Sequence, residues 1–331
     1  MTKSLWLKIL VSGLLMAWIV RRTDLGRVWE LAREVPWPWI LLFLTSALFG
    51  YWINSQRWRI LLAAQGVRAS TRTLIRSFLV GTFFNQFLPT SIGGDIVRAM
   101  DLKPKCGSLT KSLSIIAFDR FLGILVLYVF TCIGILFKLS DLAGGLVWFL
   151  AGFAPVVVGL VWLIRSGDRH LVWLKERISL PLLRKVIEKL SVIQENLAFY
   201  CSNLGPTLKV LLLAVVLQLN VIVFYYLIAL VYGSGLSLGY FFIMVPIILF
   251  GTLMPISING IGLREGLFVY FFASFGASAE KALAVAWTIF ALNLFFGLVG
   301  GLVYALRRST EPSVSYRGAD QGSDGQPDPQ T

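Results

Sequence analysis

The chain contains two copies of one short pattern, and each copy ends in an arginine. The pattern reads P-x-S-I-x-G-x-x-x-R and covers residues 89–98 and 255–264. A guanidinium group can donate two parallel hydrogen bonds to a phosphate. Acidic residues accompany both arginines, Asp95 inside the first copy and Glu265 directly after the second. The repeated pattern therefore predicts two places that bind an anionic, phosphate-bearing group.

The remaining residues of the pattern are those that interrupt a helix. Proline stops a helix because it lacks the N–H donor, and glycine permits unusual dihedral angles and a close backbone approach. A half-helix that begins after the glycines directs its N-terminal amides at the break, which favours an anion. The predicted breaks are Pro89, Gly93, Gly94, Pro255, Gly260 and Gly262.

The chain around these motifs has the composition of a membrane protein. Of its 331 residues 57% are hydrophobic and 14% are charged, with a mean hydropathy of +0.77, whereas soluble domains carry about a quarter charged residues. The apolar runs are continuous, which fits spanning helices and not the alternation of barrel strands. The net charge of +13 is carried at the ends of apolar runs. We assign it to topology and lipid headgroups and expect no nucleic-acid partner.

The apolar runs predict an all-α polytopic fold with about six full spans and two re-entrant or broken-helix hairpins. The hairpins contain the two motifs, because the apolar stretches beside them, 78–88 and 267–275, are only about half a span long. Residues 165–209 are basic and contain an amphipathic helical stripe, and residues 309–331 form a polar tail that we expect to be disordered after a membrane domain of residues 1–308. The expected spans are 5–20, 36–53, 113–137, 142–164, 210–231 and 282–305.

The basic loops predict the topology. Residues 56–77 and 165–209 are expected in the cytoplasm, as are both termini, and the four arginines of residues 21–35 are the one exception. In this arrangement the two hairpins enter the membrane from opposite faces. That geometry is the inverted repeat in which interrupted helices mark a central binding site.

Charges at membrane depth are costly and by default indicate function. The alternative is mutual neutralisation, of Asp95 with Arg98 and of Asp119 with Arg120 or Arg264. Amides within apolar runs either hydrogen-bond between helices or line a cavity; they are Asn85, Gln86, Gln218, Asn220 and Asn293. The predicted substrate-binding residues are Ser91, Asp95, Arg98, Asp119, Arg120, Ser257, Arg264 and Glu265.

Metal, cofactor and enzyme chemistry have no signal in the sequence. The three cysteines are scattered without a disulfide or metal-ligand spacing, and the single histidine, His170, lies in a basic segment. No nucleotide-binding motif, zinc pattern or nucleophile elbow is present. We therefore expect no metal, no cofactor and no catalytic residue.

The motifs resemble those of a known family. FFNQFLPTSIGGDIVRA, the FDR of residues 118–120 and LMPISINGIGLREG are similar to the flippase-like membrane domain of bacterial lysylphosphatidylglycerol synthases, over roughly residues 5–305. The resemblance implies translocation of a phospholipid or lipid-linked headgroup, along a path lined by the motif charges and Asp119-Arg120. The full-length synthases carry a soluble aminoacyltransferase domain after the membrane part. Because a short polar tail stands there in this chain, lysyl transfer is not expected.

These observations favour a lipid transporter of the bacterial inner membrane that acts on an anionic phospholipid or lipid-linked substrate. The alternative is a non-transporting accessory protein that presents a lipid intermediate to a lipid- or glycan-modifying enzyme. A membrane-embedded transferase with Asp119 or Glu265 as base is a third reading, but no donor-binding motif supports it. Partners other than the lipid, either a second copy of the chain or such an enzyme, stay open.

Overall fold

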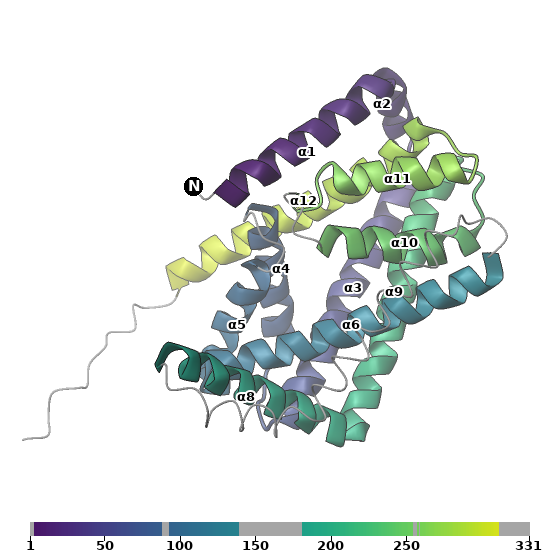
Figure 1. Cartoon of the computed structure of the whole chain (residues 1–331). Helices are drawn as coiled ribbons and strands as arrows, with labels where there is room; N and C mark the ends of the chain where they lie inside the picture. The colour runs from purple at the N-terminus through teal and green to yellow at the C-terminus, as the bar shows by residue number, and fades with distance from the viewer. Residues whose placement is uncertain (1–2, 88–92, 139–180, 254–256, 258, 311–331) are drawn as a thin grey trace, which may run out of the picture.

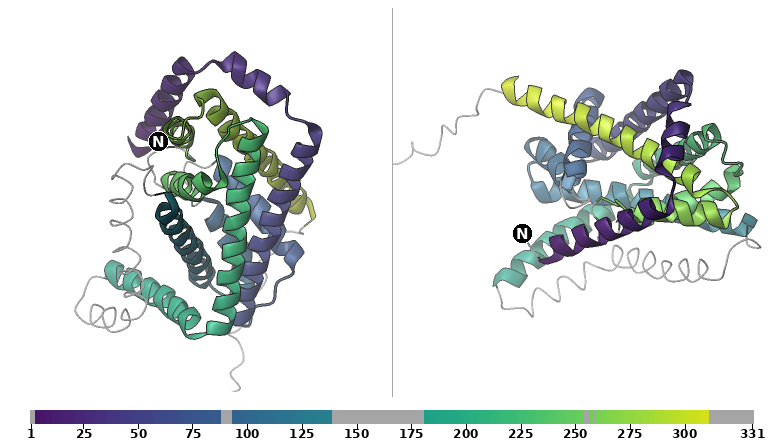
Figure 2. Two further views of the ribbon diagram at one scale, coloured as in Figure 1. Left: turned by 90° about the vertical axis from the view of Figure 1, so that its right-hand side faces the viewer. Right: turned by 90° about the horizontal axis from the view of Figure 1, so that it is seen from above.

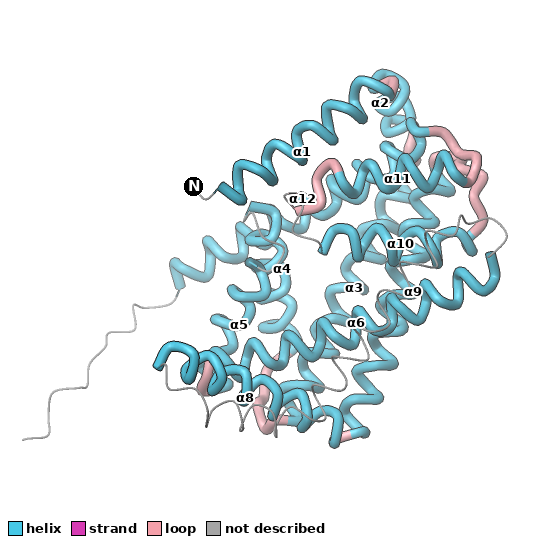
Figure 3. Tube along the Cα trace, in the orientation of Figure 1, coloured by secondary structure: helices cyan, strands magenta, loops and turns pink. Residues whose placement is uncertain are grey.

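The computed structural model describes residues 3–87, 93–138, 181–253, 257 and 259–310, and over these residues every regular element is a helix (Figures 1 and 3). Helices suit this sequence because they satisfy all their backbone hydrogen bonds within one segment, which a membrane requires. The described helices are α1 (Lys3–Arg22), α2 (Leu25–Arg33), α3 (Trp37–Ala64), α4 (Thr71–Phe87), α5 (Gly93–Cys106), α6 (Leu109–Lys138), α8 (Pro181–Ser202), α9 (Leu204–Val231), α10 (Leu238–Leu253), α11 (Leu263–Ser274) and α12 (Ala279–Thr310).

Three of the described helices are long and apolar enough to cross a membrane. They are α6 over Leu109–Gly134, α9 over its whole length and α12 over Ala279–Arg307. A fourth span is obtained when α2 and α3, which meet at 89°, are taken together. The expected span 142–164 lies outside the described residues, as does the tail beyond Thr310, so the count of about six spans stays a prediction.

The expectation of loops at 21–35 and 56–77 was wrong, because helices occupy much of both. The Asp24 carboxylate caps α2 by accepting a hydrogen bond from the Arg27 amide at 3.2 Å, and Val28 is buried. Helix α3 continues to Ala64, since arginine is a good helix former and the first glycine after the span is Gly66, with φ +77°. Pro246 lies within the continuous helix α10.

The amphipathic segment forms α8, which packs against α6 and α9. Ile187 is buried, whereas Leu190 of the same stripe is 46% exposed, so only part of the stripe faces the bundle. The buried Tyr200 hydroxyl donates a hydrogen bond to the Leu61 carbonyl at 2.9 Å, and burial raises the pKa of this tyrosine. These contacts fasten α8 to the end of α3.

Each motif follows the first helix of an antiparallel hairpin. In the first hairpin α4 packs against α5, and the Arg98 side chain lies against Gly81. In the second, α10 packs against α11, and the ring of Tyr240 stacks on that of Phe275 at 4.2 Å between centroids. The described ends of the two motif copies thus form the first turn of α5 and of α11, the second helix of each hairpin.

The two halves of the chain also pack in corresponding ways. Helix α12 lies along α4, and α6 lies along α10; α2 contacts α12, and α8 contacts α6. Helices α3 and α9 run side by side and antiparallel, because Phe43 contacts Phe224 while Ser46, one turn further on, contacts Asn220 (Figure 2). The helices α2 to α6 thus correspond in order to α8 to α12. When each helix is replaced by its counterpart, most of the helix–helix contacts are reproduced.

A pair of glycines fits this correspondence. Gly134 and Gly300 are separated by the same number of residues as Arg98 and Arg264. A Cβ atom on Gly134 would lie 3.1 Å from the Phe242 carbonyl oxygen of α10, and one on Gly300 would overlap the Leu79 carbonyl of α4. Each half thus uses a glycine to bring its long helix against the hairpin of the other half.

Candidate functional site

The tip of the first hairpin is held by backbone contacts that only glycine permits. A Cβ atom at Gly94 would overlap the Gly81 carbonyl oxygen of α4. The Gly94 amide donates a hydrogen bond to Asn85 Oδ1 at 2.7 Å, so α4 satisfies one backbone donor in the first turn of α5. The predicted break at Gly93 and Gly94 therefore coincides with the start of α5, while Pro89 and Ser91 lie outside the described residues.

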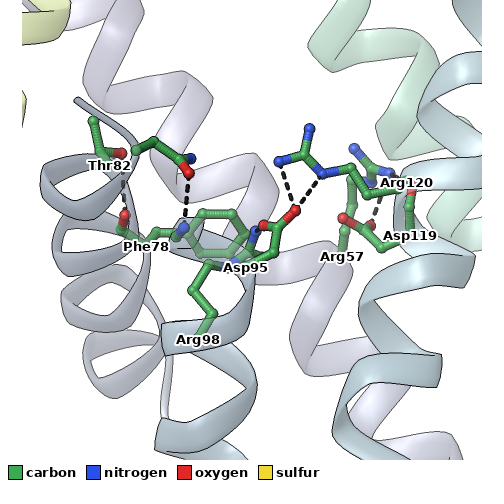
Figure 4. A network of polar contacts seen from close by, with 9 residues as sticks. Arg57, Phe78, Thr82, Asp95, Arg98, Asp119 and Arg120 are labelled. Carbon is green, nitrogen blue, oxygen red and sulfur yellow. Dashed lines mark hydrogen bonds and ion pairs between the residues drawn. The ribbon is translucent and has the colours of Figure 1, made fainter. Parts of the chain in front are cut away.

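Asp95 is shared by two arginines. Its Oδ1 accepts a hydrogen bond from Arg98 Nη1 at 2.8 Å, and its Oδ2 accepts one from Arg120 Nε at 2.8 Å (Figure 4). Arg120 Nη2 also lies 2.8 Å from Oδ2. The Asp95 and Arg98 side chains are buried, but that of Arg120 is 43% exposed. Asp95 thus connects a fixed cation with an accessible one.

Arg98 is enclosed by aromatic rings. Its Cζ lies 3.9 Å from the centre of the Trp58 ring and 3.5 Å from that of Phe78. Its Nε and Nη2 make no hydrogen bond with the described residues, so the rings take the place of further acceptors. This surrounding fixes the guanidinium toward Asp95 and leaves it little access to a ligand.

Asp119 pairs with Arg57, so the expected partners Arg120 and Arg264 were both wrong. Arg57 Nη2 lies 2.8 Å from Asp119 Oδ1 and donates a hydrogen bond to the Asp119 carbonyl at 2.8 Å. Consecutive helical residues point about 100° apart, so Asp119 faces α3 while Arg120 faces α5 (Figure 4). Arg57 was assigned to a cytoplasmic loop, yet it is 2% exposed.

Arg57 could have been recognised from its surroundings. The residues that follow it, Trp58 and Ile60 to Leu62, continue the apolar run of α3 for another turn. An arginine within such an apolar run indicates a functional residue, for the same reason as Asp119 within its own span.

In the second hairpin the acidic residue caps its own helix. Glu265 Oε2 accepts a hydrogen bond from the Gly262 amide at 2.7 Å, and Oε1 accepts one from Arg264 Nη2 at 2.7 Å. Gly262 has φ +81° and Gly260 has φ +77°, a region open to glycine, so α11 begins where the pattern predicted. One amide at the break, that of Gly262, is thus satisfied by Glu265.

Ser257 is buried, and its hydroxyl makes no hydrogen bond with the described residues. Pro255 lies outside them. The serine is therefore placed inside the protein beside the second break, with a donor that no described residue uses.

The hairpin tips meet. Asn259 Nδ2, from the second motif, donates a hydrogen bond to Gln86 Oε1 at the end of α4 at 2.9 Å. Beside this contact lie two pockets, of about 500 and about 210 Å³. Both are lined by a shared set of residues that includes Asn85, Arg120, Tyr225, Thr252 and Asn293.

The charges are divided between the two pockets. Arg57, Arg98, Asp119 and Arg120 line the larger one, and Arg264 and Arg120 line the smaller one. The volume of the larger pocket lies within the roughly 300–1,000 Å³ typical of small-molecule sites. Six of the eight predicted binding residues, all but Ser91 and Ser257, thus line the pockets or pair directly with an arginine that does.

No group of three or more His, Cys, Asp or Glu that could hold a metal ion occurs among the residues the structure describes. The carboxylates at the site are instead bonded to arginines or to the Gly262 amide. The pocket thus offers a ligand charged groups and hydrogen-bonding groups.

Long apolar helices around an ion-paired pocket, with two interrupted hairpins meeting beside it, define a multi-pass helical membrane protein with a polar internal site. The chain belongs to the family of the lysylphosphatidylglycerol synthase TM region, which matches residues 5–301. This match confirms the resemblance carried by the motifs. No curated protein and no solved structure matches the chain.

Proposed function

We propose that the protein moves a phosphate-bearing lipid headgroup between the two leaflets of the bacterial inner membrane. The observation that carries the proposal is the pocket itself, in which a partly exposed arginine faces a cavity of about 500 Å³ among apolar helices. Ionisable groups at membrane depth are expensive and mark transport pathways or ligand sites. Membership of a membrane family named for a phospholipid synthase supports a lipid as the ligand.

In this proposal Arg120 makes the first contact with the phosphate. Of the arginines at the larger pocket, Arg57 and Arg98 are buried and paired, whereas Arg120 is 43% exposed in its side chain. Arg120 Nη1 makes no hydrogen bond with the described residues, so it can donate to a phosphate oxygen while Nε stays on Asp95. Arg98 and Arg264 have a structural role in this proposal, because they stabilise the two hairpins beside the pocket that binds the headgroup.

The two hairpins are proposed to enter the membrane from opposite faces, with both termini in the cytoplasm. The corresponding packing of the two halves and the antiparallel contact of α3 with α9 support this inverted repeat. Such a pair of broken helices around a central site suits alternating access from the two leaflets. The headgroup is bound and released unchanged, so no chemical step is assigned to any residue.

The test is lipid translocation in liposomes that contain the purified full-length chain. Acyl-labelled fluorescent phosphatidylglycerol in the inner leaflet becomes accessible to a membrane-impermeant reductant only when it crosses. We expect transfer well above that of protein-free liposomes, and a reduction of about tenfold or more in Arg120→Gln, because a charge-assisted hydrogen bond contributes about 1.5–3 kcal/mol.

Arg72→Gln is the matched control, since Arg72 lies exposed near the start of α4, away from the pocket. It should translocate at the wild-type rate. Translocation by Arg120→Gln at the wild-type rate contradicts the proposed role of Arg120. Binding of lipid with no translocation by the wild type favours the accessory protein that presents a lipid.

A further inference from the structure

The ionic groups around the larger pocket carry an excess of one positive charge. Arg57, Arg98 and Arg120 face the carboxylates of Asp95 and Asp119. Arg264, at the smaller pocket, is neutralised by Glu265. A ligand with a single negative charge restores neutrality in a site where unbalanced charge is expensive.

Each carboxylate at the pocket is already engaged. Asp119 is bonded to Arg57, Asp95 is shared by Arg98 and Arg120, and the two oxygens of Glu265 accept hydrogen bonds from Arg264 and from the Gly262 amide. An ammonium group entering the pocket would add to the excess of positive charge, because each of these carboxylates is already balanced by an arginine. Zwitterionic and cationic headgroups are therefore disfavoured.

Amide groups from three helices face the same space. Gln218 of α9 and Asn293 of α12 line the larger pocket, and neither makes a hydrogen bond with the described residues. Asn85 of α4 uses its Oδ1 for the Gly94 amide, which leaves its Nδ2 to donate elsewhere. An amide both donates and accepts, which is the pattern that a hydroxyl group complements.

Resting on the proposed function, we infer that the pocket selects a lipid phosphodiester with an uncharged, hydroxyl-bearing headgroup. The diester supplies one negative charge to Arg120, and the hydroxyls bond to Asn85, Gln218 and Asn293. Two lipid sources share this chemistry, a glycerophospholipid with a polyol headgroup and a polyprenyl monophosphate that carries a sugar.

Binding of short-chain lipids to the purified full-length chain in detergent tests the inference. The probes are dihexanoyl phosphatidylglycerol, phosphatidylethanol of equal charge without headgroup hydroxyls, phosphatidic acid of higher charge, zwitterionic phosphatidylcholine and farnesyl phosphate mannose. We expect phosphatidylglycerol or farnesyl phosphate mannose to bind about tenfold more tightly than phosphatidylethanol, since each hydrogen bond contributes about 0.5–1.5 kcal/mol. The tighter of the two identifies the source.

Two variants separate the charge from the hydroxyl contacts. Gln218→Leu should reduce the preference for phosphatidylglycerol over phosphatidylethanol. Asn293→Lys adds a charge at an exposed lining position, where misfolding is not expected, and should shift the preference between phosphatidylethanol and phosphatidic acid toward phosphatidic acid. Asn293→Leu keeps the charge and should not shift this preference, because neither lipid has a polyol headgroup.

The outcomes distinguish this inference from the proposed function. Equal binding of phosphatidylglycerol, phosphatidylethanol and phosphatidylcholine overturns the headgroup selection even when liposomes show translocation. Tighter binding of phosphatidylcholine than of phosphatidylglycerol also overturns it. Selective binding without translocation supports the inference and contradicts transport.

Discussion

Arg57 and Asp119 face one another in the interior, where each is less than a tenth exposed. Removing two charges from water costs several kcal/mol for each ion, which their mutual attraction offsets only when both are present. Arg57 also bonds to the Asp119 carbonyl, so it joins α3 to the backbone of α6 as well as to its side chain. The pair therefore fixes the wall of the pocket from which Arg120 extends.

This pairing predicts a large effect when one partner is removed. Arg57→Leu leaves the Asp119 carboxylate buried without a counter-charge, and we expect the free energy of unfolding to fall by about 3–5 kcal/mol. The double variant Arg57→Leu/Asp119→Leu should recover much of this loss because no charge is left buried. Thermal unfolding in detergent measures both.

Arg59→Leu is the matched control, because Arg59 lies on the exposed side of the same helix and hydrogen-bonds only to Thr71 in the described part of the chain. Its effect should stay within about 0.5 kcal/mol, as for most surface substitutions. Equal destabilisation by Arg57→Leu and Arg59→Leu would show that the buried pair has no special role.

The charged residues of the site could be predicted from the sequence, but their pairing could not. Asp95, Arg98 and Asp119 were recognisable because each stands in or beside an apolar stretch. Their partners depend on the direction in which α3, α5 and α6 face one another, and no local pattern encodes that direction. Arg57 was missed for a different reason, since its proximity to other arginines made the whole segment look like a basic loop.

At the scale of elements, glycine determines how closely the long helices approach the hairpins. Gly300 leaves no room for a Cβ atom beside the Leu79 carbonyl, which is backbone and cannot rotate away. The equivalent Gly134 is less crowded by backbone, since an added Cβ would lie 2.7 Å from Ile243 Cγ1 and 3.1 Å from the Phe242 carbonyl oxygen. The two glycines thus lie at equivalent helix contacts, but the contact at Gly134 should tolerate an added methyl group better than the contact at Gly300.

These contacts predict an order of stability for alanine variants. Gly300→Ala should lower the free energy of unfolding by roughly 1–3 kcal/mol through overpacking, and Gly134→Ala by less. Gly13→Ala, at a helix position with no atom within 4 Å of the added Cβ, should be neutral or stabilising by up to about 1 kcal/mol. Thermal unfolding in detergent gives the order, and a Gly300→Ala variant as stable as Gly13→Ala would refute the close packing.

The helices themselves were largely predictable, because long apolar runs have few alternatives in a membrane. Their ends were harder to predict. Helix α3 continues through Arg57 and Arg59 to Ala64, and α2 forms in a segment of mixed charge because Asp24 caps it and Val28 packs into the core. In both cases tertiary contacts support a helix in a segment whose charge indicates a loop.

At the scale of the whole molecule, the two halves share a packing scheme but not a charge distribution. The positions of α12 that correspond to Asp119 and Arg120 are Val285 and Ala286, which are fully buried and apolar. Arg57, Asp119 and Arg120 therefore come from the first half alone, whereas the amides come from both halves, Asn54 and Asn85 from the first and Gln218, Asn220 and Asn293 from the second. The two halves thus share a packing scheme, and the charges of the larger pocket arise from divergence between them.

The proposed inversion predicts that the ends of the two hairpins are accessible from opposite sides of the membrane. Lys105, near the end of α5, and Ser278, after α11, are both exposed. In a background with Cys106, Cys132 and Cys201 replaced, a membrane-impermeant maleimide added to intact cells should label Ser278→Cys and leave Lys105→Cys unlabelled. Inside-out vesicles should show the reverse, because basic flanks such as Lys103 to Lys111 remain in the cytoplasm. Labelling of both positions from one side would mean that the hairpins enter from the same face, and the corresponding packing of the halves would then need a different symmetry.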